Sequence, residues 1–480
     1  MKISNPILSL FLVCLLASCA GYNKGMRQYQ SLVYSSQYAE AASQLEKIDA
    51  LQHARNRFLY LAEKGRLARL LGNLDSSNHY LNEADNLLEE TYKTVGQTIA
   101  SNLVNPLQET YLAADYERFM LHYYKALNYL ALHDNEGAVV EARRITLQAN
   151  RLADKKMLTP DGPGIFAYTL QGIIYEQAGQ INDAFVSYRN AIDLAKPDGQ
   201  LPDQLLPAAE GLLATAKLMG FTSEYNKYSS QFNINLPGKT VGAGSLLVLH
   251  DAGWSPQKEE QVFSFNSWLP GQTDLEFADP YRQNLIAVPA AEFSTVNSGL
   301  SPNWFMGLRV AMAVPKPRSP SSWTGAIQLD SNSVAFKKIQ DLNTLATRPS
   351  IMKQELVKSI LRALAKKAVE VGAQQAGKAI AKGAEKKDTD PKKTDQQKQA
   401  EQKKKDDQAA VIGAGVGLLV NLVNQATEHA DTRSWLTLPA AIYAIRVPLK
   451  LGANVITLSD GGVSKTIEVA GKAGLQVLYW

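Results

Sequence analysis

Residues 168–191 read YTLQGIIYEQAGQINDAFVSYRNA, and this stretch decides the fold of the N-terminal half. Small and aromatic residues recur in it at offsets that place them on facing sides of two short helices: Gly172, Tyr175, Gly179, Ala184, Tyr188 and Ala191. Small residues let antiparallel helices approach closely, and aromatic rings fill the gaps between them. Gly179 stands where the turn would fall, and glycine readily ends a helix there. The stretch therefore predicts a helical hairpin.

These positions resemble the roughly 34-residue tetratricopeptide (TPR) pattern. A second copy carries Leu61, Gly65, Ala68, Gly72, Leu81 and Ala84, and a third carries Ala126, Tyr129, Ala138 and Ala142, with His133-Asp134 at its turn. Matching positions in the three copies are 61 and then 46 residues apart, so longer or additional helices must intervene. We expect an irregular TPR-like repeat domain over residues 26–235. The alternative is a generic helical bundle with chance matches.

A helical repeat array presents a concave face to peptides or partner proteins. Four tyrosines are candidate partner-binding residues on that face: Tyr129, Tyr168, Tyr175 and Tyr188. Aromatic residues at helical spacing more often fill a core than line a binding surface. Core packing is therefore the favoured interpretation of all four.

A change of composition at Pro237-Gly238 opens a region of short apolar runs separated by Pro, Gly, Ser and Asn. Such runs are typical of antiparallel β structure, and we expect strands at 245–250, 262–265, 285–288, 304–314 and 325–329. The last residues predict strands at 442–447, 454–458, 464–469 and 475–480, with hairpin turns at 460–462 and 471–474. The predicted fold class is α+β. An all-α TPR-like domain precedes a mainly antiparallel β domain in two parts, 240–348 and 432–480.

A helical insertion at 349–431 separates the two β parts. Its first helix carries an apolar stripe that includes Leu356, Ile360 and Leu364. Residues 382–407 are rich in Lys and Gln and contain no large apolar residue, so we expect them to be disordered or a solvated helix. From Lys353 to Asp407 there are 15 basic and 9 acidic residues, a surplus of +6 in a chain whose net charge is +4.

Residues 409–426 (AAVIGAGVGLLVNLVNQA) form an 18-residue apolar stretch in which Gly413 and Gly417 stand four apart. Three interpretations are open. The stretch forms a helical hairpin with the helix expected at 353–380, or it contacts a membrane, or the Gly413–Gly417 helix mediates self-association. The hairpin is the simplest of the three.

The N-terminus carries a targeting signal. An apolar run at 7–16 matches a secretory signal and is too short to span a bilayer. Residues 16–19 (LASC) resemble the bacterial lipobox, which implies a signal peptide over 1–18, lipidation of Cys19 and a lipid-anchored tether over 19–25. Ala20 then implies the outer membrane, with the protein facing the periplasm. The alternative is an ordinary secretory signal, or a membrane anchor.

Composition and motifs exclude several function classes. A net charge of +4 over 480 residues is too small for a globally basic nucleic-acid binder. Both cysteines, Cys14 and Cys19, lie in the targeting segment, which excludes a disulfide framework and a cysteine-type metal site. HExxH, GxSxG and Walker A motifs do not occur. We expect no cofactor, no metal and no enzymatic activity, although a carboxylate pair assembled by the fold would leave no local trace.

Two segments carry a further resemblance: GAGSLLVLHDAGWSPQKEEQVFSF at 242–265 and EHADTRSWLTLPAAIYAIRV at 428–447. With the lipobox and the TPR-like half, they resemble an uncharacterised family of Gram-negative TPR-like lipoproteins. The genes of that family often neighbour those of lipoproteins that activate penicillin-binding proteins. The most specific part is 430–435 (ADTRSW). There we expect Asp431 and Arg433 to cap the preceding helix and clamp the following strand, with Trp435 packed at the junction.

These observations predict an outer-membrane-anchored periplasmic lipoprotein. We expect it to act as a non-catalytic protein-interaction scaffold or adaptor in the cell envelope, with another envelope protein as its partner. One alternative, which the family resemblance implies, is a regulator or activator of peptidoglycan synthesis. Another is a glycan-binding or hydrolytic β module.

Overall fold

The computed structural model describes residues 25–95, 109–154, 163–197, 201–236, 243–267, 272–293, 305–306, 308–318, 323–330, 332–349, 351–364, 366–367, 429–460 and 462–480. Four predicted features lie outside the described residues: the signal peptide at 1–18, the lipidation site Cys19, the low-complexity segment 382–407 and the apolar stretch 409–426 with Gly413 and Gly417. No helix in the described part of the chain is long and apolar enough to cross a membrane.

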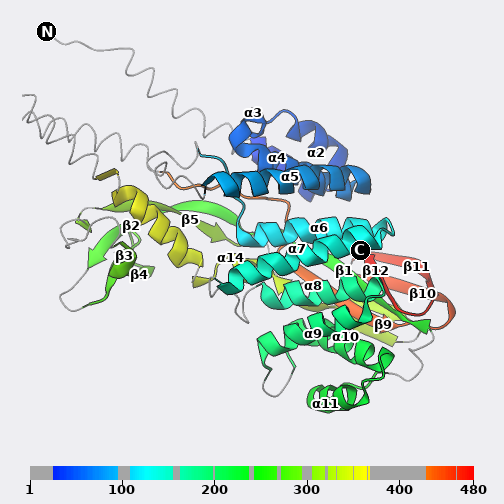
Figure 1. Cartoon of the computed structure of the whole chain (residues 1–480). Coiled ribbons are helices and arrows are strands. Elements are labelled where there is room, and N and C mark those ends of the chain that lie inside the picture. The colour runs from blue at the N-terminus through cyan, green and yellow to red at the C-terminus, as the bar shows by residue number, and fades with distance from the viewer. Residues whose placement is uncertain are drawn as a thin grey trace, which may run out of the picture.

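The N-terminal half is a stack of helices (Figure 1). A helix over 25–34 is followed by α2 (Tyr38–Leu45), α3 (Asp49–Gln52), α4 (Arg57–Leu70), α5 (Leu74–Val95), α6 (Asp115–Ala131), α7 (Asn135–Asp154), α8 (Gly164–Gln177), α9 (Ile181–Ala195), α10 (Leu206–Leu218) and α11 (Thr222–Phe232). Short 3₁₀ turns, η1 (Ala54–Asn56) and η4 (Asp203–Leu205), precede α4 and α10. Helices from α4 onward pair as the hairpins α4–α5, α6–α7, α8–α9 and α10–α11.

The same turn closes each of these hairpins. A residue with positive φ follows the first helix: Gly72 (79°), His133 (60°), Gly179 (78°) and Gly220 (72°). The next N–H then donates to a carbonyl five positions back, as from Gln180 N to Tyr175 O at 2.8 Å. This is the Schellman arrangement, which satisfies carbonyls left free at a helix end. Its recurrence shows that the array is built from repeats of one unit.

Small residues let the helices of neighbouring repeats pack closely. A Cβ on Gly172 of α8 would lie 2.5 Å from the ring of Tyr188, and a Cβ on Gly211 of α10 would lie 2.4 Å from the same ring. Tyr188, on α9, is fully buried between them. The residues that suggested the repeat in the sequence therefore form its core.

The described C-terminal half forms three four-stranded sheets. We call them the inner sheet (order β12-β1-β9-β8), the outer sheet (β11-β10-β6-β7) and the side sheet (β4-β3-β2-β5). The strands are β1 (Ser245–Ala252), β2 (Gln257–Ser267), β3 (Asp274–Ala278), β4 (Leu285–Pro289), β5 (Arg309–Lys316), β6 (Ala326–Leu329), β7 (Asn332–Ala335), β8 (Lys337–Asp341), β9 (Ala441–Pro448), β10 (Gly452–Ser459), β11 (Ser464–Gly471) and β12 (Leu475–Tyr479). The short helices are η5 (Ala290–Phe293) and α14 (Leu342–Ala346).

The strand pairs are antiparallel except for β1 and β12, which run parallel. The hairpin predicted at 471–474 is therefore wrong, because the chain crosses there from β11 in the outer sheet to β12 in the inner sheet. The crossing passes close to the start of β1: a Cβ on Gly244 would lie 2.1 Å from the carbonyl oxygen of Lys472. The other predicted hairpin, at 460–462, joins β10 and β11.

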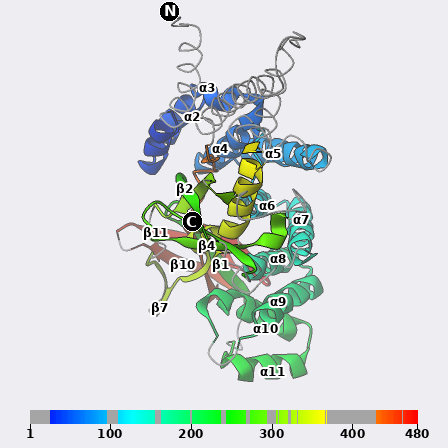
Figure 2. The ribbon, with the colours of Figure 1, turned by 90° about the vertical axis from the view of Figure 1, so that its left-hand side faces the viewer.

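The inner sheet lies between the helices and the outer sheet, and both views show it beside α6 and α8 (Figures 1 and 2). Leu247 and Leu249 of β1 pack into the core of the helical array, whereas Leu246 and Val248 pack toward the outer sheet. Side chains of successive strand residues point to opposite faces, so this alternation buries both faces of the inner sheet. Burial on both faces is also the usual setting of parallel strand pairing.

The side sheet has its own core. Leu356, Ile360 and Leu364 of the helix over 351–364 are fully buried against it, together with Phe277 and Phe305. The predicted apolar stripe of the insertion is therefore covered by the side sheet. The α+β prediction, with a TPR-like helical region before a β region that a helix interrupts, is confirmed.

Candidate functional site

The strongest candidate region is the seam between the helical array and the C-terminal half. The first helices of the four hairpins line this seam and have almost no solvated face; in α8, every residue from Thr169 to Glu176 is buried. Each of them carries one glutamate near the C-terminal half: Glu63 on α4, Glu117 on α6, Glu176 on α8 and Glu210 on α10. We call these four the inner glutamates. A carboxylate removed from water needs hydrogen-bond donors, so a fully buried glutamate marks a specific contact.

Glu63 binds the segment that leads into β9. Its carboxylate accepts hydrogen bonds from Leu436 N (2.7 Å), Thr437 Oγ1 (2.6 Å) and Tyr29 OH (3.1 Å), and its side chain is fully buried. Burial raises the pKa of Glu63 to about 7, against the lowering effect of these hydrogen bonds. Glu63 therefore ties α4 to the C-terminal half through neutral donors alone.

Glu117 binds the same segment one residue earlier. It accepts hydrogen bonds from Trp435 N (2.8 Å), Tyr111 OH (2.7 Å) and Ala114 N (2.8 Å). The Trp435 ring is buried and packs edge-on against Phe58 and Tyr124, with ring centroids 6.4 and 5.9 Å apart. Trp435 therefore packs against α4 and α6 of the array, whereas the expectation placed it between the insertion helix and the following strand.

Arg433 forms a clamp, but its main partners differ from those expected. The guanidinium donates to Asp431 (2.7 and 2.8 Å), to Asn56 Oδ1 (2.6 Å) and to the carbonyl of Glu109 (3.2 Å). Asn56 directly precedes α4, and Glu109 lies between α5 and α6, so both belong to the helical array. The expectation was that Arg433 would hold the first strand of the last β block. The reason is that residues 433–438 cross the array before β9 begins.

Asp251, near the end of β1, is the centre of a second buried network. It accepts hydrogen bonds from Tyr123 OH (3.0 Å), Tyr124 OH (2.8 Å) and Tyr479 OH (2.9 Å). Its ion pair with Arg66 of α4 spans 3.1 Å, and both side chains are about 5% exposed. One carboxylate therefore joins α4, α6, β1 and β12.

The third inner glutamate is held by an arginine. Arg446 of β9 forms an ion pair with Glu176 through both terminal nitrogens, and its Nε donates to Ser245 Oγ (3.0 Å). Tyr188 OH also donates to Glu176, at 2.8 Å. The guanidinium of Arg446 is therefore already committed, to a carboxylate that is itself fully buried.

Glu210 lies beside this pair and lines a pocket of about 190 Å³. The described residues around the pocket come from α8, α10, the segment after α11 and the ends of β1, β9 and β12: Glu176, Glu210, Ala214, Lys217, Leu218, Ile234, Asn235, Leu236, Gly244, Ser245, Arg446, Pro448 and Gly474. Burial raises the pKa of Glu210 to about 7, and the positive charge of Arg446 opposes this effect.

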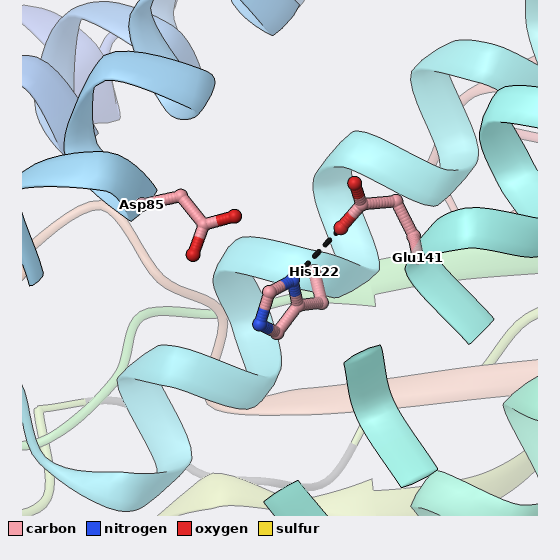
Figure 3. A group of neighbouring side chains, drawn as sticks. All are labelled: Asp85, His122 and Glu141. Carbon is pink, nitrogen blue, oxygen red and sulfur yellow. Dashed lines mark hydrogen bonds and ion pairs between the residues drawn. The ribbon is translucent and has the colours of Figure 1, made fainter. Parts of the chain in front are cut away.

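A charged cluster inside the array has the residue types of a metal site (Figure 3). Asp85, His122 and Glu141 converge there from α5, α6 and α7, and all three are buried. However, the ammonium of Lys125 lies between the two carboxylates, 2.7 Å from Asp85 and 2.9 Å from Glu141. Burial acts to raise the pKa of Asp85, but His122, Lys125 and Arg144 together lower it. We interpret the cluster as a charge-balanced network in which Lys125 takes the place a cation would occupy.

Glu176 and Glu210 are the two carboxylates that line the pocket. A two-carboxylate mechanism needs one proton donor and one free carboxylate acting as nucleophile or base. Glu210, whose pKa is raised to about 7, has the property of the proton donor. Glu176 beside it is held in an ion pair with Arg446.

The structure places the four candidate tyrosines in or against the core of the array. Tyr188 is fully buried and Tyr175 is 8% exposed, so neither offers a surface to a partner. Tyr129 and Tyr168 are partly buried and pack against the same core. The rings of these four tyrosines, which were the candidates for a concave binding face, instead pack in or against the core between the helices.

The sequence-based analysis overlooked the inner glutamates and Asp251. Glu63 occurs in the apolar run FLYLAEKGRLARLL (58–71), and an acidic residue within such a run is a signal that it has a specific buried partner. Asp251 directly follows the strand expected at 245–250, and no local pattern marks it. The partner residues are hundreds of positions away, as for Arg66 and Tyr479, which are separated by 413 residues.

No protein-family model matches the chain, and no curated protein matches it. Among solved structures, MamA 41-end from Desulfovibrio magneticus RS-1 is 14% identical and covers 44% of this chain and 92% of its own, with a TM-score of 0.29. A Podosopora anserina putative kinesin light chain with TPR-like repeats is 17% identical over 44% of this chain and 91% of its own, with a TM-score of 0.31. PilW, a type IV pilus biogenesis factor, is 16% identical over 45% of this chain and 79% of its own, with a TM-score of 0.27.

Proposed function

We propose that this protein is a non-catalytic protein-interaction scaffold of the cell envelope, anchored in the outer membrane through lipid on Cys19 and facing the periplasm. The observation that carries the scaffold role is the repeat array itself, since stacked helical hairpins offer extended surfaces to protein partners. The lipobox-like residues 16–19 support the location.

The seam restricts where a partner can bind. In an open array the inner helices face a groove, but here that face is covered by the protein's own inner sheet and by residues 433–438. The partner surface therefore lies on the outer helices. On α7, Val140 and Leu147 are 47% and 59% exposed and stand seven residues apart, so they lie on one helix face. Apolar side chains exposed on one face are typical of a contact surface.

In-cell photocrosslinking of the full chain tests this surface. A photoreactive residue at Leu147 should give a specific adduct with an envelope protein, and a matched residue at the exposed Val463, between β10 and β11, should not. An adduct from position 463 alone would assign partner binding to the β region. Failure of both positions to give a specific adduct would contradict the scaffold role.

Cys19→Ala tests the location separately. Without the thiol no lipid can be attached, and we expect the protein to leave the membrane fraction. If the variant stays membrane-bound, the lipid-anchor proposal is wrong and another segment anchors the chain.

Regulation of peptidoglycan synthesis is the more specific form of this proposal. Its support is the resemblance carried by residues 430–435, whose side chains and backbone hold the seam together. The purified full chain should change the rate of a peptidoglycan synthase in a reconstituted assay. An unchanged rate would leave the scaffold proposal standing without this partner class.

A further inference from the structure

The fourth inner glutamate, Glu210, differs from the other three in accepting no hydrogen bond from a residue that the structure describes. Glu63 and Glu117 each accept three hydrogen bonds, and Glu176 accepts them from Arg446 and Tyr188. Among the described residues, no donor contacts the carboxylate of Glu210, although that carboxylate lines a pocket. Glu210 is only partly buried, so a ligand can reach its carboxylate from solvent, and a charged donor there would form a charge-assisted hydrogen bond.

Among the described residues around the pocket, no cation forms an ion pair with Glu210. Arg446 is committed to Glu176 by a bidentate ion pair, and its Nε donates to Ser245. Lys217, the other basic residue of the lining, holds its ammonium over the ring of Tyr225, 6.0 Å from the ring centre. The Glu176–Arg446 pair is neutral as a unit, so Glu210 is the acidic group of the lining that forms no ion pair with a described residue.

The walls of the pocket are mainly apolar. Ala214 and Leu218 of α10, Ile234 and Leu236 of the following segment, and Pro448 of β9 line it. The volume, about 190 Å³, is below the roughly 300–1,000 Å³ of sites for drug-sized ligands. The pocket therefore suits a short hydrocarbon chain that carries one polar head.

We propose that this pocket binds a primary alkylammonium group, with the hydrocarbon chain against the apolar walls and the ammonium donating to Glu210. The ammonium supplies both the donors and the positive charge that Glu210 lacks. The chemistry is shared by a free alkylamine and by a lysine side chain of another protein. The site does not depend on the scaffold proposal, since a free amine would fill it in the absence of any protein partner.

Ligand-observed NMR titrations of the full chain at pH 8 test the proposal. The probes are n-pentylamine, its neutral analogue 1-pentanol and its anionic analogue pentanoate. We expect n-pentylamine to bind at least tenfold more tightly than either analogue. Pentanoate binding as tightly as the amine would overturn the proposal, because Arg446 and Lys217 would then define an anion site.

Two variants assign the binding to this pocket. Glu210→Gln keeps the shape and removes the charge, so amine affinity should fall at least tenfold; Glu224→Gln, on the exposed face of α11, should leave it unchanged. Ala214→Leu fills the pocket while leaving Glu210 in place, and it tests the proposal even if Glu210→Gln does not fold. Amine binding that survives a folded Glu210→Gln variant or the Ala214→Leu variant would refute the assignment.

The pH dependence gives an independent readout. With a pKa of about 7, Glu210 is mostly protonated at pH 6 and mostly ionised at pH 8. The other charged groups that face it are Glu176 on α8, Arg446 on β9 and Lys217 on α10. Because only the ionised form pairs with an ammonium, amine binding should be about tenfold weaker at pH 6 than at pH 8. An equal affinity at both values would contradict the pairing.

The source of the ammonium is decided by one more probe, Nα-acetyl-L-lysine N-methylamide, which presents a lysine side chain between two peptide groups. If it binds as tightly as n-pentylamine, the pocket accepts a lysine from a polypeptide. If only the free amine binds, the natural ligand is a small alkylamine. Both results support the alkylammonium site and differ only in what delivers the ammonium.

Discussion

Asp251→Ala is the most informative single perturbation of the seam. The substitution removes the acceptor of three tyrosine hydroxyls and the counter-ion of Arg66, which is buried. The Nε and Nη1 atoms of Arg66 contact no acceptor in the described part of the chain, so Asp251 provides most of its compensation. Removing one partner of a buried ion pair costs roughly 3–5 kcal/mol, because the remaining charge is left without compensation. We expect a loss of about 4 kcal/mol in the free energy of unfolding.

Urea unfolding of the full chain at pH 7 measures this loss, with circular dichroism at 222 nm reporting the helices. Tyr123→Phe is the matched control, since it removes one donor to Asp251 and leaves the ion pair, and it should cost about 1 kcal/mol. In the double variant with Arg66→Met, the two substitutions should cost about 2 kcal/mol less together than the sum of their separate costs. A loss below ~1 kcal/mol for Asp251→Ala, or additivity within ~0.5 kcal/mol, would refute the reasoning.

Three further predictions concern other buried groups. Glu63 has a higher pKa in the folded protein than in the unfolded chain, so its contribution to stability is lost as pH rises from about 4.5 to 7. Glu63→Gln should therefore bring the free energies of unfolding at pH 5 and pH 8, measured by urea unfolding, closer together by up to roughly 3 kcal/mol. An unchanged difference between the two pH values would contradict this. Gly211→Ala places a Cβ 2.4 Å from the Tyr188 ring and should lower the free energy of unfolding by roughly 1–3 kcal/mol, measured by thermal unfolding. In the control Gly462→Ala the new Cβ meets nothing within 4 Å, so Tm should stay unchanged. Lys125→Met should lower the free energy of unfolding by roughly 3–5 kcal/mol, because it leaves Asp85 and Glu141 without the ammonium between them. Zn²⁺ should then raise the Tm of this variant but not that of the unaltered protein. Equal Tm shifts would show that Lys125 does not occupy the cation position.

The helical half could be predicted from the sequence because its determinants are local. The turn residues Gly72, Gly179 and Gly220 stand at fixed offsets from the small and aromatic residues that pack around them. Strands with a clear apolar run, such as β1 and β9, were also expected close to their observed bounds. By contrast, β7 (Asn332–Ala335) is exposed at every position, so it has no alternation of apolar and polar residues that could reveal it.

The seam could not be predicted because its contacts join distant parts of the chain. Arg66 and Asp251 are 185 residues apart, and Glu63 and Thr437 are 374 apart. Periodicity within a helix shows that a face is buried but not what covers it. For the same reason, the four tyrosines were correctly favoured as core residues, whereas the groove they were thought to border is occupied by a sheet that the local pattern could not place there.

Burial on all sides makes the array and the inner sheet depend on each other. The inner sheet has one apolar face toward the helices and one toward the outer sheet, so removing the helices would expose Leu247, Leu249 and Ile442 to water. Removing the sheet would leave Glu63 and Arg66 without most of their partners. Each half therefore supplies the cover that the other lacks, and the concave recognition used by open repeat arrays is replaced by an internal contact. Among the described residues, what remains for other molecules is the outer helix faces, the exposed edges of the sheets and Glu210, the inner glutamate that accepts no hydrogen bond there.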